Sequence, residues 1–154
     1  MVRLRDLPEN ERAHLMEREL KPFDTQPWVP GPSLAQRRVA IVSTAGLHDR
    51  GDRAFFNRTG EYRVIPGDVT GAELVMSHAS VNFDRTGFQH DVNVVFPIDR
   101  MRELAAEGVI GSLGSLHYSF MGAGVTAELL EPHARELAGH LRADGVDTVF
   151  LVPV

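Results

Sequence analysis

The chain contains no cysteine among its 154 residues. This absence excludes a disulfide, a thiolate zinc site, an iron–sulfur cluster and a cysteine nucleophile within these residues.

The sequence also lacks long apolar runs, an excess of basic residues and a secretory leader. No stretch approaches the roughly 18 uncharged apolar residues that a membrane span needs. The first residues, MVRLRDLPENER, are charged and lack the apolar core of a signal peptide, so we expect a cytoplasmic protein. A net charge of −5 predicts no binding to nucleic acid, because it leaves no basic surface for phosphates.

What the sequence does contain is an alternation of strand and helix patterns over residues 37–154, preceded by a helix and a proline-rich arm over residues 1–36. The alternation predicts a single α/β domain with a mainly parallel, twisted sheet and flanking helices. The arm holds four prolines between residues 21 and 33, and we expect Phe23 and Trp28 to anchor it.

Short apolar runs and helix stop signals predict the individual elements. Predicted strands cover residues 37–43, 62–66, 93–98 and 148–152, and the last is expected to be buried. Asp99 is expected to cap a helix that ends at Gly108. A second helix over residues 126–143 is expected to kink or restart at Pro132 and to end at Gly145. Five glycines between residues 108 and 124 predict close backbone approach or an anion-binding turn.

Polar residues crowd into the stretch SHASVNFDRTGFQHDVNVVFPIDRMR, residues 77–102, beside an apolar run at residues 94–98. Polar groups beside a buried strand either form a satisfied network or carry chemistry. A further polar loop, STAGLHDRGD, follows the first predicted strand, where ligands of open α/β sheets bind.

These positions give two sets of candidate site residues. Candidates for acid–base chemistry are His78, His90, Asp91 and His117, because an imidazole near neutral pKa transfers protons and a carboxylate fixes its tautomer. Candidates for contacting a substrate are Ser43, Thr44, His48, Asn93, Tyr118 and Met121.

Other interpretations of the same residues stay open. Asp and Asn beside a strand end often cap the next turn, and the glycines of the first loop are typical of a polar turn. A metal site would draw on His48, His78, His90, Asp91 and His117, but none of these has paired ligand spacing and no metal is expected. The serines lack the G-x-S-x-G elbow, which argues against a hydrolase.

Long strings in the chain, among them STAGLH, D-x-NVVFPIDR and HYSFMG, resemble the selenoprotein B family of the glycine, sarcosine, betaine and D-proline reductases. The likeness extends from about Trp28 to Val154 through residues 39–55, 77–104, 108–124 and 141–154. It implies reductive cleavage of a carbon–nitrogen bond in a small amino-acid-like substrate. A dithiol would be the electron donor, and a selenocysteine-x-x-cysteine or cysteine-x-x-cysteine pair would be the reacting centre.

In the branch that the chain resembles, this pair follows directly after a strand similar to VDTVFLVPV. We therefore expect the reading frame to continue through an in-frame UGA after Val154, and these residues to be an inactive, substrate-side portion. UAA or UAG at that codon would contradict the expectation. The uncovered last strand and the arm further predict a protein partner or a homo-oligomer. Alternatives are a cysteine-free binding or assembly domain and a His/Asp metal-dependent enzyme.

Overall fold

The computed structural model describes residues 3–17, 26–56, 59–80 and 85–154. The chain forms two compact units, Met1–Pro30 and Gly31–Val154. In the first unit, a 3-10 helix at Leu4–Asp6 precedes α1 at Glu9–Met16, and neither element has a buried residue. Trp28, which was expected to anchor the arm, is 89% exposed. Phe23 lies outside the described residues.

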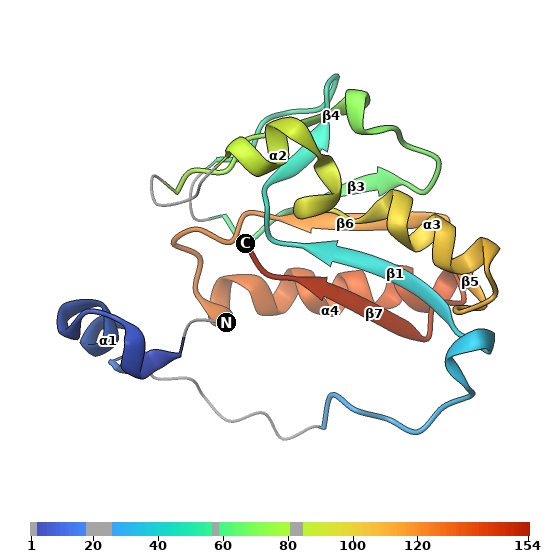
Figure 1. Ribbon diagram of the computed structural model, residues 1–154, viewed down its shortest axis with the longest axis horizontal. Coiled ribbons are helices and arrows are strands. Elements are labelled where there is room, and N and C mark those ends of the chain that lie inside the picture. Colours follow the sequence, from blue (N-terminus) through green and yellow to red (C-terminus); the bar gives the residue numbers. More distant parts are fainter. Residues whose placement is uncertain (1–2, 18–25, 57–58, 81–84) are drawn as a thin grey trace. The chain divides into compact units, whose positions relative to one another are not determined.

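The second unit is built on a mixed, mainly parallel sheet, as predicted (Figure 1). Its strands are β1 at Arg38–Ser43, β3 at Tyr62–Pro66, β5 at Ser112–Leu113, β6 at Leu116–Phe120 and β7 at Thr148–Val152. β5, β6 and β7 all run parallel to β1, and β3 pairs antiparallel with β6. Since β6 and β7 both pair with Val42 and Ser43, they lie on opposite sides of β1.

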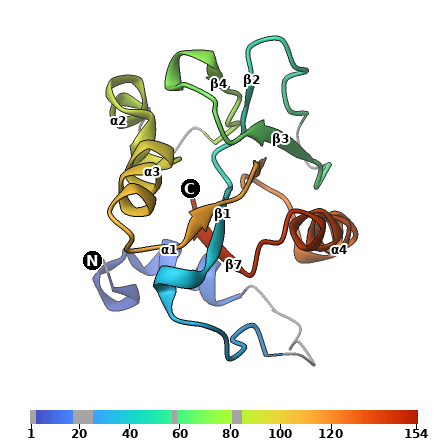
Figure 2. The same cartoon turned by 90° about the vertical axis from the view of Figure 1, so that its right-hand side faces the viewer.

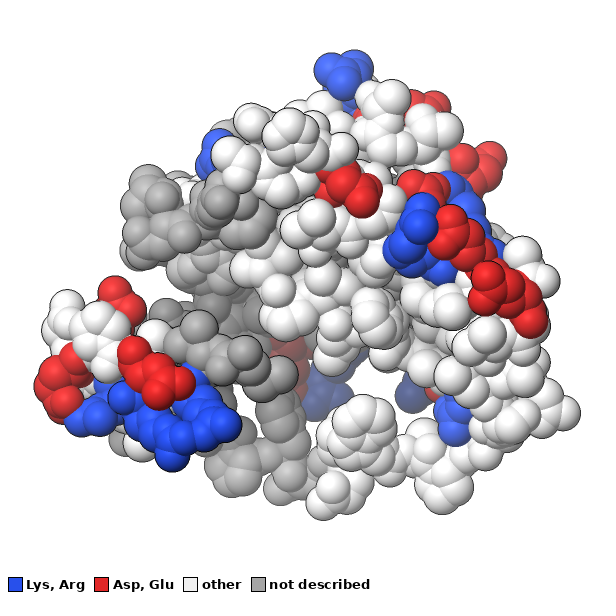
Figure 3. Space-filling view, in the orientation of Figure 1, with Lys and Arg blue, Asp and Glu red and all other residues white. Residues whose placement is uncertain are grey.

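Helices cover both faces of this sheet (Figure 2). α3 at Ile98–Ala106 covers one face, where Ile98 and Met101 join Val39, Ile41 and Phe96 in the larger core cluster. α4 at Ala127–Ala143 covers the other, where Leu137 packs with Tyr118 and Phe120. On the face seen in Figure 3, basic and acidic side chains interleave over α3, where Arg100 pairs with Glu103.

A smaller layer lies on the α3 side of the sheet (Figure 2). It consists of β2 at Leu47–Asp49 paired antiparallel with β4 at Leu74–Met76, a 3-10 turn at Gly71–Glu73, α2 at Thr86–His90 and a 3-10 turn at Val92–Val94. Leu47 and Leu74 attach this layer to the larger core cluster. None of the described helices is both long and apolar enough to span a membrane.

The predicted strand over residues 93–98 is wrong. Its first residues form the 3-10 turn, and α3 begins at Ile98 with Pro97 as its N-cap residue. The apolar run inserts Val95, Phe96 and Ile98 into the core, whereas Val94 is 60% exposed. Asp99 is not the cap either, because it lies inside α3 as the second helical residue, where its N–H donates to the Asn93 side-chain oxygen at 3.0 Å.

The helix ends agree with prediction, but the exposure of the last strand does not. Gly108 and Gly145 end α3 and α4 with φ values of +73° and +70°, which a glycine adopts without strain. α4 continues through Pro132 as one helix rather than restarting there. β7 is not buried: Phe150 is 46% and Leu151 69% exposed, and β7 pairs with β1 alone among the described strands.

Candidate site at the carboxyl ends of the strands

The carboxyl ends of β1, β6 and β7 meet around Thr44. The Thr44 hydroxyl accepts a hydrogen bond from the Val154 N–H at 2.8 Å and lies 3.2 Å from the Val154 carbonyl oxygen, to which it can donate. The Thr44 carbonyl accepts from the Gly122 N–H at 3.0 Å. A side chain at Gly122 would come within 2.9 Å of Thr44 and 3.1 Å of the Val154 carbonyl, so the close approach requires glycine.

Two further side chains reach the same edge of the sheet. His78 follows β4 in the chain, and Met121 follows β6. The Met121 sulfur accepts from the Ala79 N–H at 3.4 Å, and Met121 is buried. Gly46 lets these parts approach, since a Cβ there would lie 3.0 Å from the Met121 methyl and 3.2 Å from the His78 backbone. We call Thr44, His78, Met121, Gly122 and the Val154 backbone the strand-end site.

His78 is the ionisable group of the strand-end site, and it is only 4% exposed. Burial is the main cause that lowers the pKa of His78, and the positive charge of Arg85 acts in the same direction. A hydrogen bond with the Val154 backbone opposes them. Arg85, which precedes α2, also donates to the His78 carbonyl. The imidazole is therefore neutral at neutral pH, and its Nδ1 accepts from the Ser80 N–H at 3.3 Å.

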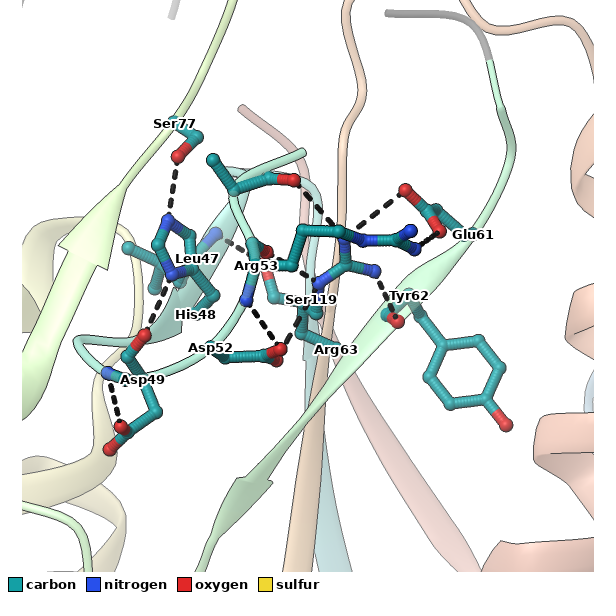
Figure 4. A network of polar contacts seen from close by, with 12 residues as sticks. Leu47, His48, Asp49, Asp52, Arg53, Glu61, Tyr62, Arg63, Ser77 and Ser119 are labelled. Carbon is teal, nitrogen blue, oxygen red and sulfur yellow. Dashed lines mark hydrogen bonds and ion pairs between the residues drawn. The ribbon is translucent and has the colours of Figure 1, made fainter. Parts of the chain in front are cut away.

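Ser43 and His48, two predicted substrate contacts, are engaged in holding the fold. The Ser43 hydroxyl donates to the Val95 carbonyl at 2.8 Å and accepts from the Ala45 N–H at 3.2 Å. The two ring nitrogens of His48 lie 2.7 Å from the Asp49 carbonyl oxygen and 2.6 Å from the Ser77 hydroxyl (Figure 4). These bonds fix the loop that carries Thr44 and the segment that carries His78.

Beside His48 lies a buried arginine that the sequence did not single out (Figure 4). Arg63 on β3 donates to the backbone carbonyls of Arg53 at 2.9 Å and Ala54 at 3.3 Å, and it pairs with Glu61 at 3.1 Å. Its guanidinium carbon lies 4.5 Å from the ring centroid of Phe55. A charged residue in a short strand is typical of a solvent-facing position. Only the tertiary fold therefore shows that Arg63 is buried and binds the backbone of residues 53–54.

His117 and Tyr118 are neighbours on β6 and point to opposite faces of the sheet. His117 is fully buried against Phe96 on the α3 side, and its Nδ1 accepts from the Ile41 N–H at 3.0 Å. Burial, together with Arg102, lowers the pKa of His117 to about 4. Tyr118 packs with Leu137 on the α4 side, where burial raises the pKa of its hydroxyl. The side chains of His117 and Tyr118 therefore lie on opposite faces of the sheet and do not share a site.

The remaining candidates, His90, Asp91 and Asn93, lie in and after α2. Asp91 accepts from the Asn93 N–H at 2.9 Å and from its amide group at 2.7 Å, and these bonds lower the pKa of Asp91. The Asn93 amide also donates to Asp99 at 3.0 Å, so Asn93 joins the 3-10 turn to the start of α3. His90 and Asp91 line a separate cleft of about 420 Å³, here called the α2 cleft.

The five potential metal ligands do not assemble into a site. Across the described ranges, no three His, Asp or Glu side chains are placed to share an ion. His48, His90 and His117 lie respectively in β2, at the end of α2 and inside the core next to β1. The metal-dependent alternative therefore has no geometric support in this part of the chain.

Comparisons with known proteins agree on one family. Residues 10–154 match the family model of glycine/sarcosine/betaine reductase selenoprotein B. The chain is 38% identical over 128 residues to the D-proline reductase subunit gamma of Acetoanaerobium sticklandii, which covers 80% of this chain and 52% of that subunit. It is 32% identical over 137 residues to the glycine reductase complex component B subunit gamma of Symbiobacterium thermophilum, covering 84% of this chain and 31% of the relative.

A third relative, the sarcosine reductase complex component B subunit beta of Peptoclostridium acidaminophilum, is 32% identical over 138 residues, covering 84% of this chain and 31% of that subunit. The chain thus spans about half the length of the D-proline reductase subunit and about a third of the other two. No solved structure gives a significant match. Because the family model covers almost the whole sequence, the chain belongs to the glycine/sarcosine/betaine reductase selenoprotein B family.

Proposed function

We propose that the chain is the substrate-side part of a reductase complex that cleaves a carbon–nitrogen bond of a small amino-acid-like substrate. The names of the relatives, which are subunits of D-proline, glycine and sarcosine reductases, support this reaction class. The observation that carries the proposal is the strand-end site, where a buried neutral histidine lies beside the Val154 backbone and the Thr44 hydroxyl binds the Val154 N–H.

The reaction needs a reducing group that these residues do not contain. Replacing a carbon–nitrogen bond by a carbon–hydrogen bond consumes two electrons and two protons, which a dithiol supplies as it becomes a disulfide. Since the chain has no cysteine, the thiol or selenol comes from outside these 154 residues and acts at the strand-end site.

His78 would act as the general base and then as the general acid of this reaction. A neutral imidazole can take the proton of an incoming thiol or selenol, which leaves the more nucleophilic anion. The imidazolium formed would then donate that proton to the leaving amine. A lowered pKa suits the second step, because it makes the imidazolium a stronger acid.

A second candidate function, an assembly module without redox chemistry, rests on β7. Its Val149, Phe150 and Leu151 are exposed apolar side chains that another protein could cover. Such a module would bring partners together without turnover.

Reconstitution distinguishes the two functions. The assay measures dithiol-dependent release of amine from D-proline, sarcosine or glycine by the reductase complex, with and without this chain joined to a selenocysteine- or cysteine-containing segment. Turnover that depends on both the chain and the added group supports the reductase. A complex that assembles only when this chain is present, but whose turnover does not depend on the thiol or selenol segment joined to it, supports the assembly module and contradicts the reductase.

A further inference from the structure

His48 on β2 is a buried histidine that the proposed chemistry does not use. Its Nδ1 lies 2.7 Å from the Asp49 carbonyl oxygen, and its Nε2 lies 2.6 Å from the Ser77 hydroxyl (Figure 4). A carbonyl oxygen can only accept, so in the neutral ring Nδ1 carries the hydrogen and Nε2 has the lone pair. The Ser77 hydroxyl therefore donates to Nε2.

The His48 ring is itself held in place on the Asp49 side. Asp49 is paired with β4 in the smaller layer, and its carboxylate accepts from the Gly51 N–H at 2.8 Å. The Phe55 ring packs edge-on against the His48 ring, with 6.4 Å between the ring centroids. His48 therefore presents a fixed acceptor to the Ser77 hydroxyl.

The bond to His48 acts on the backbone next to His78. Ser77 directly follows β4 and precedes His78, and its N–H donates to the Gly46 carbonyl at 2.9 Å. On the other side of His78, the Ala79 N–H donates to the Met121 sulfur at 3.4 Å, and a thioether is a weak acceptor. The Ser77 hydroxyl thus adds a side-chain bond at the position directly before His78.

We propose that His48 is a positioning residue for His78: its Nε2 holds the Ser77 hydroxyl and so fixes the backbone from which the His78 ring reaches the strand-end site. His48 does not touch the reacting atoms and acts through Ser77. A role in stability alone would require only that the ring fill its buried space, whereas positioning requires the acceptor at Nε2. The effect on turnover rests on the proposed function, but the effect on the His78 ring does not.

Two variants of His48 separate the two bonds of its ring. His48→Gln has an amide oxygen that reaches about the position of Nε2 and can still accept from Ser77. The shorter side chain of His48→Asn reaches only about the position of Nδ1, where its amide can donate to the Asp49 carbonyl but cannot reach Ser77. Ser77→Ala removes the hydroxyl and leaves His48 unchanged. Amide spectra show whether each variant keeps the fold.

Nuclear magnetic resonance titration of the His78 ring in the chain alone is the first test, because it needs no reducing group. We expect Ser77→Ala and His48→Asn to raise the pKa of His78 toward its ordinary value, since a looser segment exposes the ring to water. In His48→Gln the pKa of His78 should equal that of the wild type. An unchanged pKa in folded Ser77→Ala, or an equal rise in both His48 variants, would overturn the proposal.

Amine release by the assembled reductase is the second test. Ser77→Ala and His48→Asn should lower kcat by about tenfold or more and change KM by less than about twofold, because a misplaced acid–base group slows the chemical step. His48→Gln should stay within about threefold of the wild-type kcat. Asp144→Ala is the control, since it removes an ion pair at the other end of the sheet and should leave kcat unchanged.

The two tests distinguish this inference from the proposed function. A wild-type complex without turnover would contradict the reductase, and the titration alone would then decide the role of His48. A kcat that falls equally in both His48 variants, or that is unchanged in Ser77→Ala, would overturn the positioning role while the reductase stands.

Discussion

The two ends of the central sheet differ in how their polar side chains are bonded. At the amino end of β1, Arg38 and Asp144 form an ion pair at 2.8 Å, and the second Asp144 oxygen accepts from the Ser115 N–H at 2.6 Å. At the carboxyl end, the Thr44 hydroxyl accepts from the Val154 N–H at 2.8 Å, and the His78 Nδ1 accepts from the Ser80 N–H at 3.3 Å. Charge is neutralised at the end that holds the sheet together, whereas the other end keeps an uncharged titratable group.

This contrast predicts that variants at the carboxyl end change turnover and variants at the amino end change stability. The largest expected effect is on catalysis. His78→Gln should reduce amine release by the assembled reductase about 1,000-fold, because a positioned acid–base group contributes about that much. The exposed His140→Gln on α4 is the control. Turnover within a factor of about three of the wild type would remove His78 from the mechanism.

Removing the Asp144 carboxylate at the amino end of β1 should lower the stability of the fold without changing the rate of the reaction. Asp144→Ala leaves Arg38 without its partner and the Ser115 N–H without an acceptor, so we expect a loss of about 3 kcal/mol in the free energy of unfolding. Urea denaturation measures it. The exposed pair partner Glu131→Ala should change stability by less than about 0.5 kcal/mol. If Asp144→Ala lowered the free energy of unfolding by as little as Glu131→Ala, the bonds of Asp144 to Arg38 and Ser115 would not stabilise the fold.

His117 lies in the core rather than at either end of the sheet, so its titration should change stability and not turnover. Its pKa falls from 6.5 to about 4 on folding, so below pH 6.5 the unfolded chain binds the proton first. Stability is therefore retained above pH 6.5 and lost as the pH falls toward 4, by about 2 kcal/mol between pH 7 and pH 5. Urea denaturation at both pH values checks this, and His117→Gln should remove that part of the loss.

The smallest expected effect concerns Thr44. Thr44→Val removes the hydroxyl that binds the Val154 N–H, at a cost of about 1 kcal/mol in unfolding free energy, while Thr44→Ser should retain most of it. Hydrogen exchange of the Val154 amide reports the loss directly. Equal exchange rates in the two variants would contradict the role given to the hydroxyl.

Local sequence patterns predicted those parts of the fold that have a clear local signal. The strands at residues 37–43 and 62–66 and the two helix-ending glycines are confirmed, since β-branched runs and positive φ leave marks in the sequence. The run at residues 93–98 was misassigned because apolar residues without a period fit a strand or a core-filling turn equally well. Only the tertiary fold shows that Phe96 and Ile98 reach the core from a turn and a helix start.

The candidate site was predictable to the extent that it follows strand ends. Thr44 and Gly122 meet because they follow β1 and β6, and parallel strands bring their carboxyl ends together. His117 and Tyr118 could have been separated from sequence alone, since adjacent residues of a strand face opposite ways. Burial of Arg63 and bonding of Asp91 to Asn93 depend on distant or turn-specific contacts that no periodicity encodes.

The bare edge of β7 has a consequence for how the protein is made. Five consecutive residues, Thr148–Val152, carry no charge and no proline, and strands of this kind join readily to other unpaired strands. A chain produced faster than this edge is covered would therefore be exposed to aggregation. The yield of soluble protein thus depends on the timing of synthesis as well as on the stability of the fold.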